Sequence, residues 1–167
     1  MTDAKRLYDE DFVLWAEQQA AALRAAAQGA SNLELDWENL AEEIDSLGTS
    51  QRSALRSQIR RIIRHLIKLE YSLAQDPRRG WRESVNDARE EIRDLLEDSP
   101  SLRTTISELL PGQLARGIEQ AINDLKEYQE VASMDLPRLR ATTYTEEQVL
   151  GDWFPPEPAR GSGAAVS

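Results

Sequence analysis

The chain has 167 residues and a formal net charge of −10, with 40% hydrophobic and 30% charged residues. This balance indicates a globular chain long enough for one domain, and the negative charge disfavours a surface that binds nucleic acid as a whole. The chain contains no cysteine, which excludes disulfides, thiolate metal sites and a cysteine nucleophile.

The N-terminus does not have the pattern of a targeting or membrane segment. The first nine residues lack an apolar signal region, and no window contains the roughly 18 apolar residues of a membrane span. We therefore expect a cytoplasmic protein with no membrane partner.

Apolar residues at helical spacing predict a first helix to about residue 28, with Asp11 or Asp9 as its cap and Gly29 after its end. A second helix is predicted from Asp36 to residue 47. Its apolar face would consist of Trp37, Leu40, Ala41, Ile44 and Leu47.

Gly48 is expected to end that second helix, and a long third helix is predicted over residues 49–73. Its apolar arc is wide enough to pack on two sides, which favours a central place in a bundle. Residues 75–80 contain Pro77 and Gly80 and read as a turn. The expected core residues of the third helix are Leu55, Ile59, Ile62, Leu66, Leu69 and Leu73.

A fourth helix is predicted to begin near Trp81 and to break at Ser99, with Pro100 at the first position of a short helix. That short helix should end at residues 110–112. A sixth helix would then cover residues 113–132, with a stripe that ends at Tyr128.

The C-terminal part contains weaker signals. Thr145 is expected to cap one more helical turn through Leu150, and residues 153–156 should form an aromatic clasp that packs back on the bundle. Residues 156–167 have the composition of a flexible, disordered tail.

Several of these motifs occur together in one known family. They are DWENLAEEI at residues 36–44, HLIKL at 65–69, the segment from Trp81 through LLEDSPSLR at 95–103, and YDEDF at 8–12. Over residues 6–155 the chain resembles DUF29, a family of small bacterial proteins. The resemblance implies an all-α, single-domain bundle of about five to six helices, and it implies no catalytic residue.

Glu38 and Glu42 share one face of the second helix with Asp45, and such a set of oxygen ligands could hold a divalent cation. His65, the only histidine, could complete a metal or polar site. In the alternative interpretation the carboxylates form a solvated face and His65 is a core-edge residue. The Glu-x-x-His pairs of di-iron bundles are absent, since residue 62 is isoleucine.

The third helix contains six basic residues and no acidic residue between positions 49 and 69, a pattern that can follow a phosphate backbone. Pairing with the acidic residues of the second helix is the alternative, with the unpaired charges in solvent. Arg78 and Arg79 add a further basic turn beside Trp81. The candidate anion-binding residues are Arg60, Arg61, Arg64, Arg78 and Arg79.

The chain has no nucleotide-binding glycine loop and no nucleophile elbow, so we expect no cofactor and no common nucleotide-dependent activity. The leading hypothesis is a non-enzymatic helical module that binds a protein partner or associates with itself. Nucleic-acid binding through the third helix and a metal-dependent enzyme using Glu38, Glu42 and His65 are the alternatives.

Overall fold

The computed structural model describes residues 4–29, 34–128, 130 and 134–159. These residues form seven α-helices and one 3-10 helix and contain no strand, which confirms the all-α prediction. Five of the α-helices have seven or more residues. Within the described ranges, no helix is long and apolar enough to cross a membrane.

The chain divides into two compact units. The first unit consists of residues 1–57 and 91–108, and the second of residues 58–90 and 109–167. Several helices contribute residues to both units, so the expectation of one domain over residues 6–155 stays a prediction. The helices are α1 (Ala4–Glu10), α2 (Phe12–Gln28), α3 (Trp37–Tyr71), α4 (Arg78–Asp98), η1 (Pro100–Thr105), α5 (Ile106–Glu127), α6 (Leu136–Arg140) and α7 (Glu146–Leu150).

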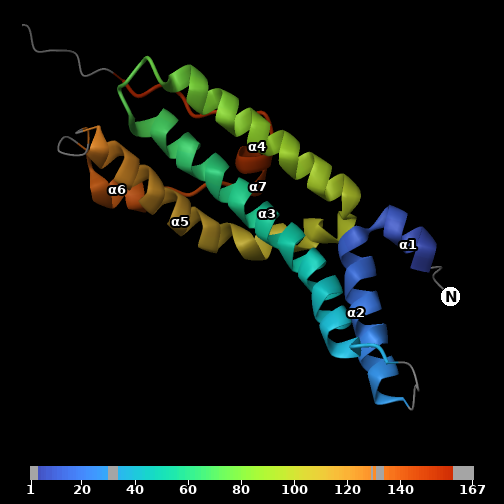
Figure 1. Ribbon diagram of the computed structural model, residues 1–167. Coiled ribbons are helices and arrows are strands. Elements are labelled where there is room, and N and C mark those ends of the chain that lie inside the picture. The colour runs from blue at the N-terminus through green and yellow to red at the C-terminus, as the bar shows by residue number, and fades with distance from the viewer. Residues whose placement is uncertain (1–3, 30–33, 129, 131–133, 160–167) are drawn as a thin grey trace, which may run out of the picture. The chain divides into compact units, whose positions relative to one another are not determined.

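In the first unit, α2 and the N-terminal part of α3 lie side by side (Figure 1). Arg24 of α2 binds Asp45 of α3 at 3.1 Å, and Glu17 of α2 accepts a hydrogen bond from Arg52. These two ion pairs lie on one side of the contact between the helices. Its buried centre contains Val13, Ala16, Ala20, Ala41 and Gly48.

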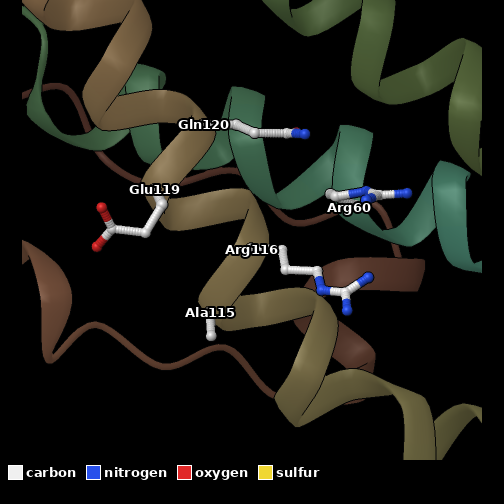
Figure 2. Close-up of a pocket in the computed structure, with 5 residues that line it drawn as sticks. All are labelled: Arg60, Ala115, Arg116, Glu119 and Gln120. Atoms are coloured by element: carbon white, nitrogen blue, oxygen red, sulfur yellow. The ribbon is translucent and has the colours of Figure 1, made fainter.

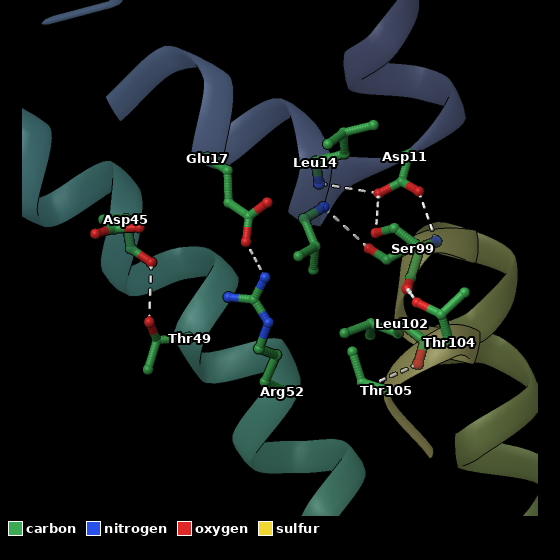
Figure 3. A network of polar contacts seen from close by, with 12 residues as sticks. Asp11, Leu14, Glu17, Asp45, Thr49, Arg52, Ser99, Leu102, Thr104 and Thr105 are labelled. Atoms are coloured by element: carbon green, nitrogen blue, oxygen red, sulfur yellow. Dashed lines mark hydrogen bonds and ion pairs between the residues drawn. The ribbon is translucent and has the colours of Figure 1, made fainter. Parts of the chain in front are cut away.

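The predicted caps of α2 and α3 are present. Asp11 Oδ1 accepts the Leu14 amide at 2.9 Å, and Asp36 Oδ1 accepts the Asn39 amide at 3.2 Å. Asp11 has a second function, because its carboxylate also accepts the amide and the hydroxyl of Ser101 (Figure 3). This buried carboxylate therefore joins the start of α2 to η1.

The predicted break at Gly48 is wrong, because α3 continues from Trp37 to Tyr71 as one helix. Gly48 is buried where α3 meets α2, and a Cβ there would lie 3.7 Å from Cβ of Ala16. A mid-helix glycine costs about 1 kcal/mol relative to alanine, which close packing on α2 can offset. Tertiary contact thus overrides the local stop signal.

In the second unit, the C-terminal part of α3 lies beside α4 and α5, as Figure 1 shows. Trp81 and the isoleucines of α3 are buried there, as predicted. The buried hydrophobic residues of this unit include Ile59, Ile62, Ile63, Leu66, Ile67, Leu69, Trp81, Val85, Ala88, Ile118, Ala121, Ile122 and Leu125.

The predicted break at residues 110–112 is also wrong, since Pro111 lies inside α5. A proline at this point removes one hydrogen bond, to the carbonyl of Ser107. Both residues are exposed, so water can bind that carbonyl and the helix continues. The expected helix end at residue 132 lies outside the described residues, and α5 ends at Glu127.

In the second unit, two predicted core residues are exposed: Leu73 at 52% and Tyr128 at 67%. Each lies just beyond the end of its helix, where the chain no longer follows the helical stripe. The 3-10 helix η1 replaces the first part of the predicted fifth helix, with Pro100 at its start as expected.

The C-terminal clasp is present. Thr145 forms a capping box with Gln148 at the start of α7, and Trp153 contacts the ring of Tyr144. The ring of Phe154 lies 4.9 Å from the guanidinium carbons of Arg82 and Arg89. The expected disordered tail falls mostly on residues 160–167, outside the described residues.

Candidate functional site

The residues of the predicted metal or polar site belong to both units. Because α3 does not turn at Gly48, Glu42 and His65 lie on one helix, about six turns apart. Glu38 and Glu42 are exposed in the first unit, and His65 is half-buried in the second. Among the described residues, no group of three or more histidines and acidic residues could hold a metal ion.

His65 lies among cations. Its pKa is lowered to about 4, chiefly by burial and also by the positive charges of Lys68, Arg64 and Arg61. Its Nδ1 is buried and has no hydrogen-bond partner in the described part of the chain. A ring with this pKa is neutral at neutral pH and is poorly matched to proton transfer there.

Three basic residues of α3, Arg52, Arg64 and Lys68, bind carboxylates from other helices. Arg64 donates two hydrogen bonds to Asp124 of α5, at 2.7 and 2.5 Å, and Lys68 Nζ lies 2.9 Å from the same carboxylate. Burial alone would raise the pKa of Asp124, but the hydrogen bonds from Arg64 and Lys68 lower it below its ordinary value. Lys68 is only 5% exposed and lies over the ring of Trp81, so this basic residue of the third helix is not one of the charges in solvent.

Arg78 and Arg79 also have partners. Arg78 is buried and donates to the carbonyls of Leu69 and Ser72, so it caps the C-terminal end of α3. Arg79 pairs with Glu83 one turn along α4. Arg78 therefore has a structural function that the sequence pattern alone did not indicate.

Arg60 lines a surface hollow of about 540 Å³ together with Ala115, Arg116, Glu119 and Gln120 of α5. Figure 2 shows the Glu119 side chain directed away from Arg60 and Arg116. Glu119 instead accepts hydrogen bonds from Arg140, which also lower its pKa. Arg60 and Arg61 each make a further interaction. The hollow is thus a mixed polar surface in which the carboxylate of Glu119 is already paired with Arg140.

The first unit contains a different kind of surface. Leu40 and Leu47, predicted to lie in the core, are 42% and 45% exposed, and Ile44 between them is half-buried. These three residues, here called the leucine stripe, recur at i, i+4 and i+7. The outer two lie about 100° around α3 from the buried Ala41 and Gly48. The apolar arc of α3 is therefore wider than α2 covers.

An aromatic cluster lies at the base of α2. Tyr8 makes edge contacts with Phe12 and Trp15, with ring centres 5.8 and 4.8 Å apart, and the Phe12 and Trp15 rings stack at 5.8 Å. Tyr8 is 51% exposed. These rings are on the side of α2 opposite Glu17 and Arg24, which is also the side of the leucine stripe.

A hollow of about 340 Å³ joins the two features. Its lining consists of Tyr8, Asp9, Phe12, Gln51 and Asp98, here called the aromatic-acidic hollow. Gln51 continues the leucine stripe by one turn, four residues after Leu47. Its Oε1 is buried and accepts no hydrogen bond from any described residue.

Sequence reasoning did not find this hollow. Asp9 and Asp98 are far apart in the chain, and each reads by itself as an ordinary surface acid. The available signal was the spacing of Leu40 and Leu47, which places both on the predicted apolar face of the second helix. Spacing alone does not show whether a neighbouring helix covers that face.

Charge is divided unequally between the units. The first unit has 16 Asp and Glu against 7 Lys and Arg, a net charge of −9, and the second has 14 against 13, a net charge of −1. Nearly all of the net negative charge of the chain therefore belongs to the first unit, which also contains the leucine stripe and the aromatic-acidic hollow.

Comparisons with known proteins agree with the fold. A crystal structure at 1.45 Å resolution of an alpha-helical protein of unknown function from Rhodospirillum rubrum is similar, with a TM-score of 0.68 and 25% sequence identity. The likeness covers 87% of this chain and 89% of that one. No curated protein matches the sequence. The family model described as domain of unknown function DUF29 matches residues 7–154, so the chain belongs to the DUF29 family.

Proposed function

We propose that this protein is a non-enzymatic helical module that acts by binding another protein through the first unit. The observation that carries the proposal is the exposure of Leu40 and Leu47 at a seven-residue spacing. Folded monomers rarely leave contiguous apolar patches exposed, and such patches commonly mark binding surfaces.

The spacing of the leucine stripe suits a helical partner. Residues at i, i+4 and i+7 correspond to the alternating apolar positions of a coiled-coil seam, which accept side chains from a facing helix. The neighbouring rings of Tyr8, Phe12 and Trp15 add the aromatic residues that are enriched in interface centres. A single added helix would cover both features.

The other candidate residues support this proposal indirectly. The basic side chains of α3 bind Glu17 and Asp124, which favours a structural role over contact with a phosphate backbone. His65 is held neutral by its surroundings, which favours a structural role for it as well.

Affinity purification of the tagged full-length chain from its native host tests the proposal. We expect specific co-purifying proteins that fall by about tenfold or more in Leu40→Gln/Leu47→Gln, since loss of a central apolar anchor costs about 2 kcal/mol or more. Leu73→Gln is the matched control, because Leu73 is equally exposed but lies in the second unit.

Sedimentation velocity at micromolar concentration tests self-association as the alternative form of the same proposal. A dimer that dissociates in Leu40→Gln/Leu47→Gln would identify a second copy as the partner. A monomeric chain whose co-purifying proteins are the same in wild type and double variant would contradict the proposed function.

A further inference from the structure

The residues beside the leucine stripe indicate the chemistry of the partner, an assignment that rests on the proposed function. We infer that the first unit binds a basic amphipathic helix, whose apolar side packs on the leucine stripe and one of whose Lys or Arg side chains enters the aromatic-acidic hollow. Three observations lead to this assignment: the lining of the hollow, its position on the stripe, and the charge around it.

The lining of the hollow combines the groups that bind a cationic side chain. Asp9 and Asp98 supply carboxylates, and no described residue forms an ion pair with either of them. Tyr8 and Phe12 supply aromatic rings, and a ring face attracts a cation within about 6 Å of its centre. An anionic or purely apolar group would gain nothing from the two carboxylates.

Gln51 adds an acceptor for the same ligand. Gln51 lines the hollow, and its Oε1 is buried and accepts no hydrogen bond from the described residues. An unpaired buried acceptor is unfavourable, and a rotation of the Gln51 side chain toward the hollow would let it accept from an ammonium or guanidinium group there. The aromatic rings, the carboxylates and this oxygen all favour a positively charged donor.

The hollow is in register with the leucine stripe. Gln51 follows Leu47 by four residues and Ile44 by seven, so it occupies the next position of the same helical seam. A helix that packs along the stripe would therefore present its next residue toward the hollow. The single anchor that best fits there is a long basic side chain, whose methylene groups can lie against the rings.

Charge favours such a partner over a second copy of this chain. The first unit has a net charge of −9, so two first units would repel one another, whereas a basic helix would be attracted. Glu43 lies beside the stripe, about 60° around α3 from Leu40, whereas Glu38 and Glu42 lie on the opposite face of the helix. Anionic membranes and nucleic acids would be repelled for the same reason.

The test uses two synthetic helical peptides with leucine at the seam positions, one with lysine at all other positions and one with glutamate. Fluorescence anisotropy measures their binding to the full-length chain at low and moderate salt. We expect the Leu/Lys peptide to bind at least about tenfold more tightly than the Leu/Glu peptide, with weaker binding as salt screens the charges.

Two double variants locate the binding. Asp9→Asn/Asp98→Asn should weaken binding of the Leu/Lys peptide by about threefold to tenfold, and Leu40→Gln/Leu47→Gln by about tenfold or more. The control is Asp87→Asn/Leu73→Gln, which removes one exposed acid and one exposed leucine from the second unit. It should change the dissociation constant by less than about twofold.

Equal binding of the two peptides, or a Leu/Lys affinity that Asp9→Asn/Asp98→Asn leaves unchanged, would overturn the inference. If Leu40→Gln/Leu47→Gln still abolishes the native co-purifying proteins in that case, the proposed function stands and only the partner chemistry is wrong. If Leu40→Gln/Leu47→Gln leaves those proteins unaffected as well, both the proposed function and the inferred partner chemistry are wrong.

Discussion

Gly117 of α5 lies directly against Ile63 of α3: a Cβ added to Gly117 would be 2.7 Å from Cγ2 and 2.9 Å from Cβ of Ile63. Ile63 is fully buried, so it has no free space into which it can move. The close approach of these two helices therefore depends on a residue without a side chain.

Gly117→Ala should destabilise the protein by about 1–3 kcal/mol, because overpacking of a close-packed core outweighs the better helix propensity of alanine. Urea unfolding followed by circular dichroism measures the change. Gly112→Ala is the matched control on the same helix, with no atom within 4 Å of the added Cβ, and should stabilise the protein by up to about 1 kcal/mol. If the two substitutions change the free energy of unfolding in the same direction, the close contact between Gly117 and Ile63 is contradicted.

Asp124→Asn should destabilise the second unit by about 2–3 kcal/mol, because Lys68 would stay buried without a counter-charge. This figure is below that for a fully buried pair, since the Arg64 side chain is 40% exposed. Thermal and urea unfolding provide the measurement. Glu119→Gln removes a carboxylate from the half-exposed pair with Arg140 and should have little effect. A comparable loss of stability in both variants would show that the charges of Lys68 and Arg64 do not need the Asp124 carboxylate as their counter-charge.

Arg89 is 1% exposed and donates hydrogen bonds to the carbonyls of Val149, Gln148 and Trp153. Arg89→Met should cost about 2–4 kcal/mol, because buried acceptors lose charged donors. Hydrogen–deuterium exchange should become faster over residues 145–154.

Arg82→Met is the control for Arg89. It removes the other cation over the Phe154 ring but none of these three hydrogen bonds, and should cost under about 1 kcal/mol. Unchanged exchange over residues 145–154 in Arg89→Met would mean that the C-terminal clasp is held by other contacts.

His65 should make stability depend on pH between about 6.5 and 4. Its folded-state pKa of about 4 is below the ordinary value of 6.5, so on acidification the unfolded chain binds a proton that the folded chain does not. The stability that neutral His65 contributes is complete above about pH 6.5 and is lost as pH falls toward 4. The urea midpoint should therefore fall less steeply in His65→Gln than in wild type over this window, and parallel curves would contradict the assignment.

Local signals in the sequence predicted the features that depend on neighbouring residues. Asp11, Asp36 and Thr145 cap the expected helices because each bonds an amide three residues away. Gly48 and Pro111 are local signals for a helix end, but packing on α2 at Gly48 and exposure to water at Pro111 allow each helix to continue.

Features that depend on distant pairing could not be predicted. The partner of Arg64 is Asp124, 60 positions away, and not the acidic residues of the predicted second helix. The aromatic-acidic hollow needs Asp9 and Asp98 to meet through the fold. Periodicity revealed the wide apolar arc of α3, but it could not show that no helix among the described residues covers Leu40 and Leu47.

The central claim is that the leucine stripe is covered by a partner protein. Photo-crosslinking tests it most directly, with a photoreactive amino acid at position 47, or at position 73 as the control, in the full-length chain in its native host. We predict a discrete adduct from position 47 that is absent from position 73 and is lost when Leu40→Gln is added. Equal labelling from the two positions, or an adduct from position 47 that is insensitive to Leu40→Gln, would contradict the claim.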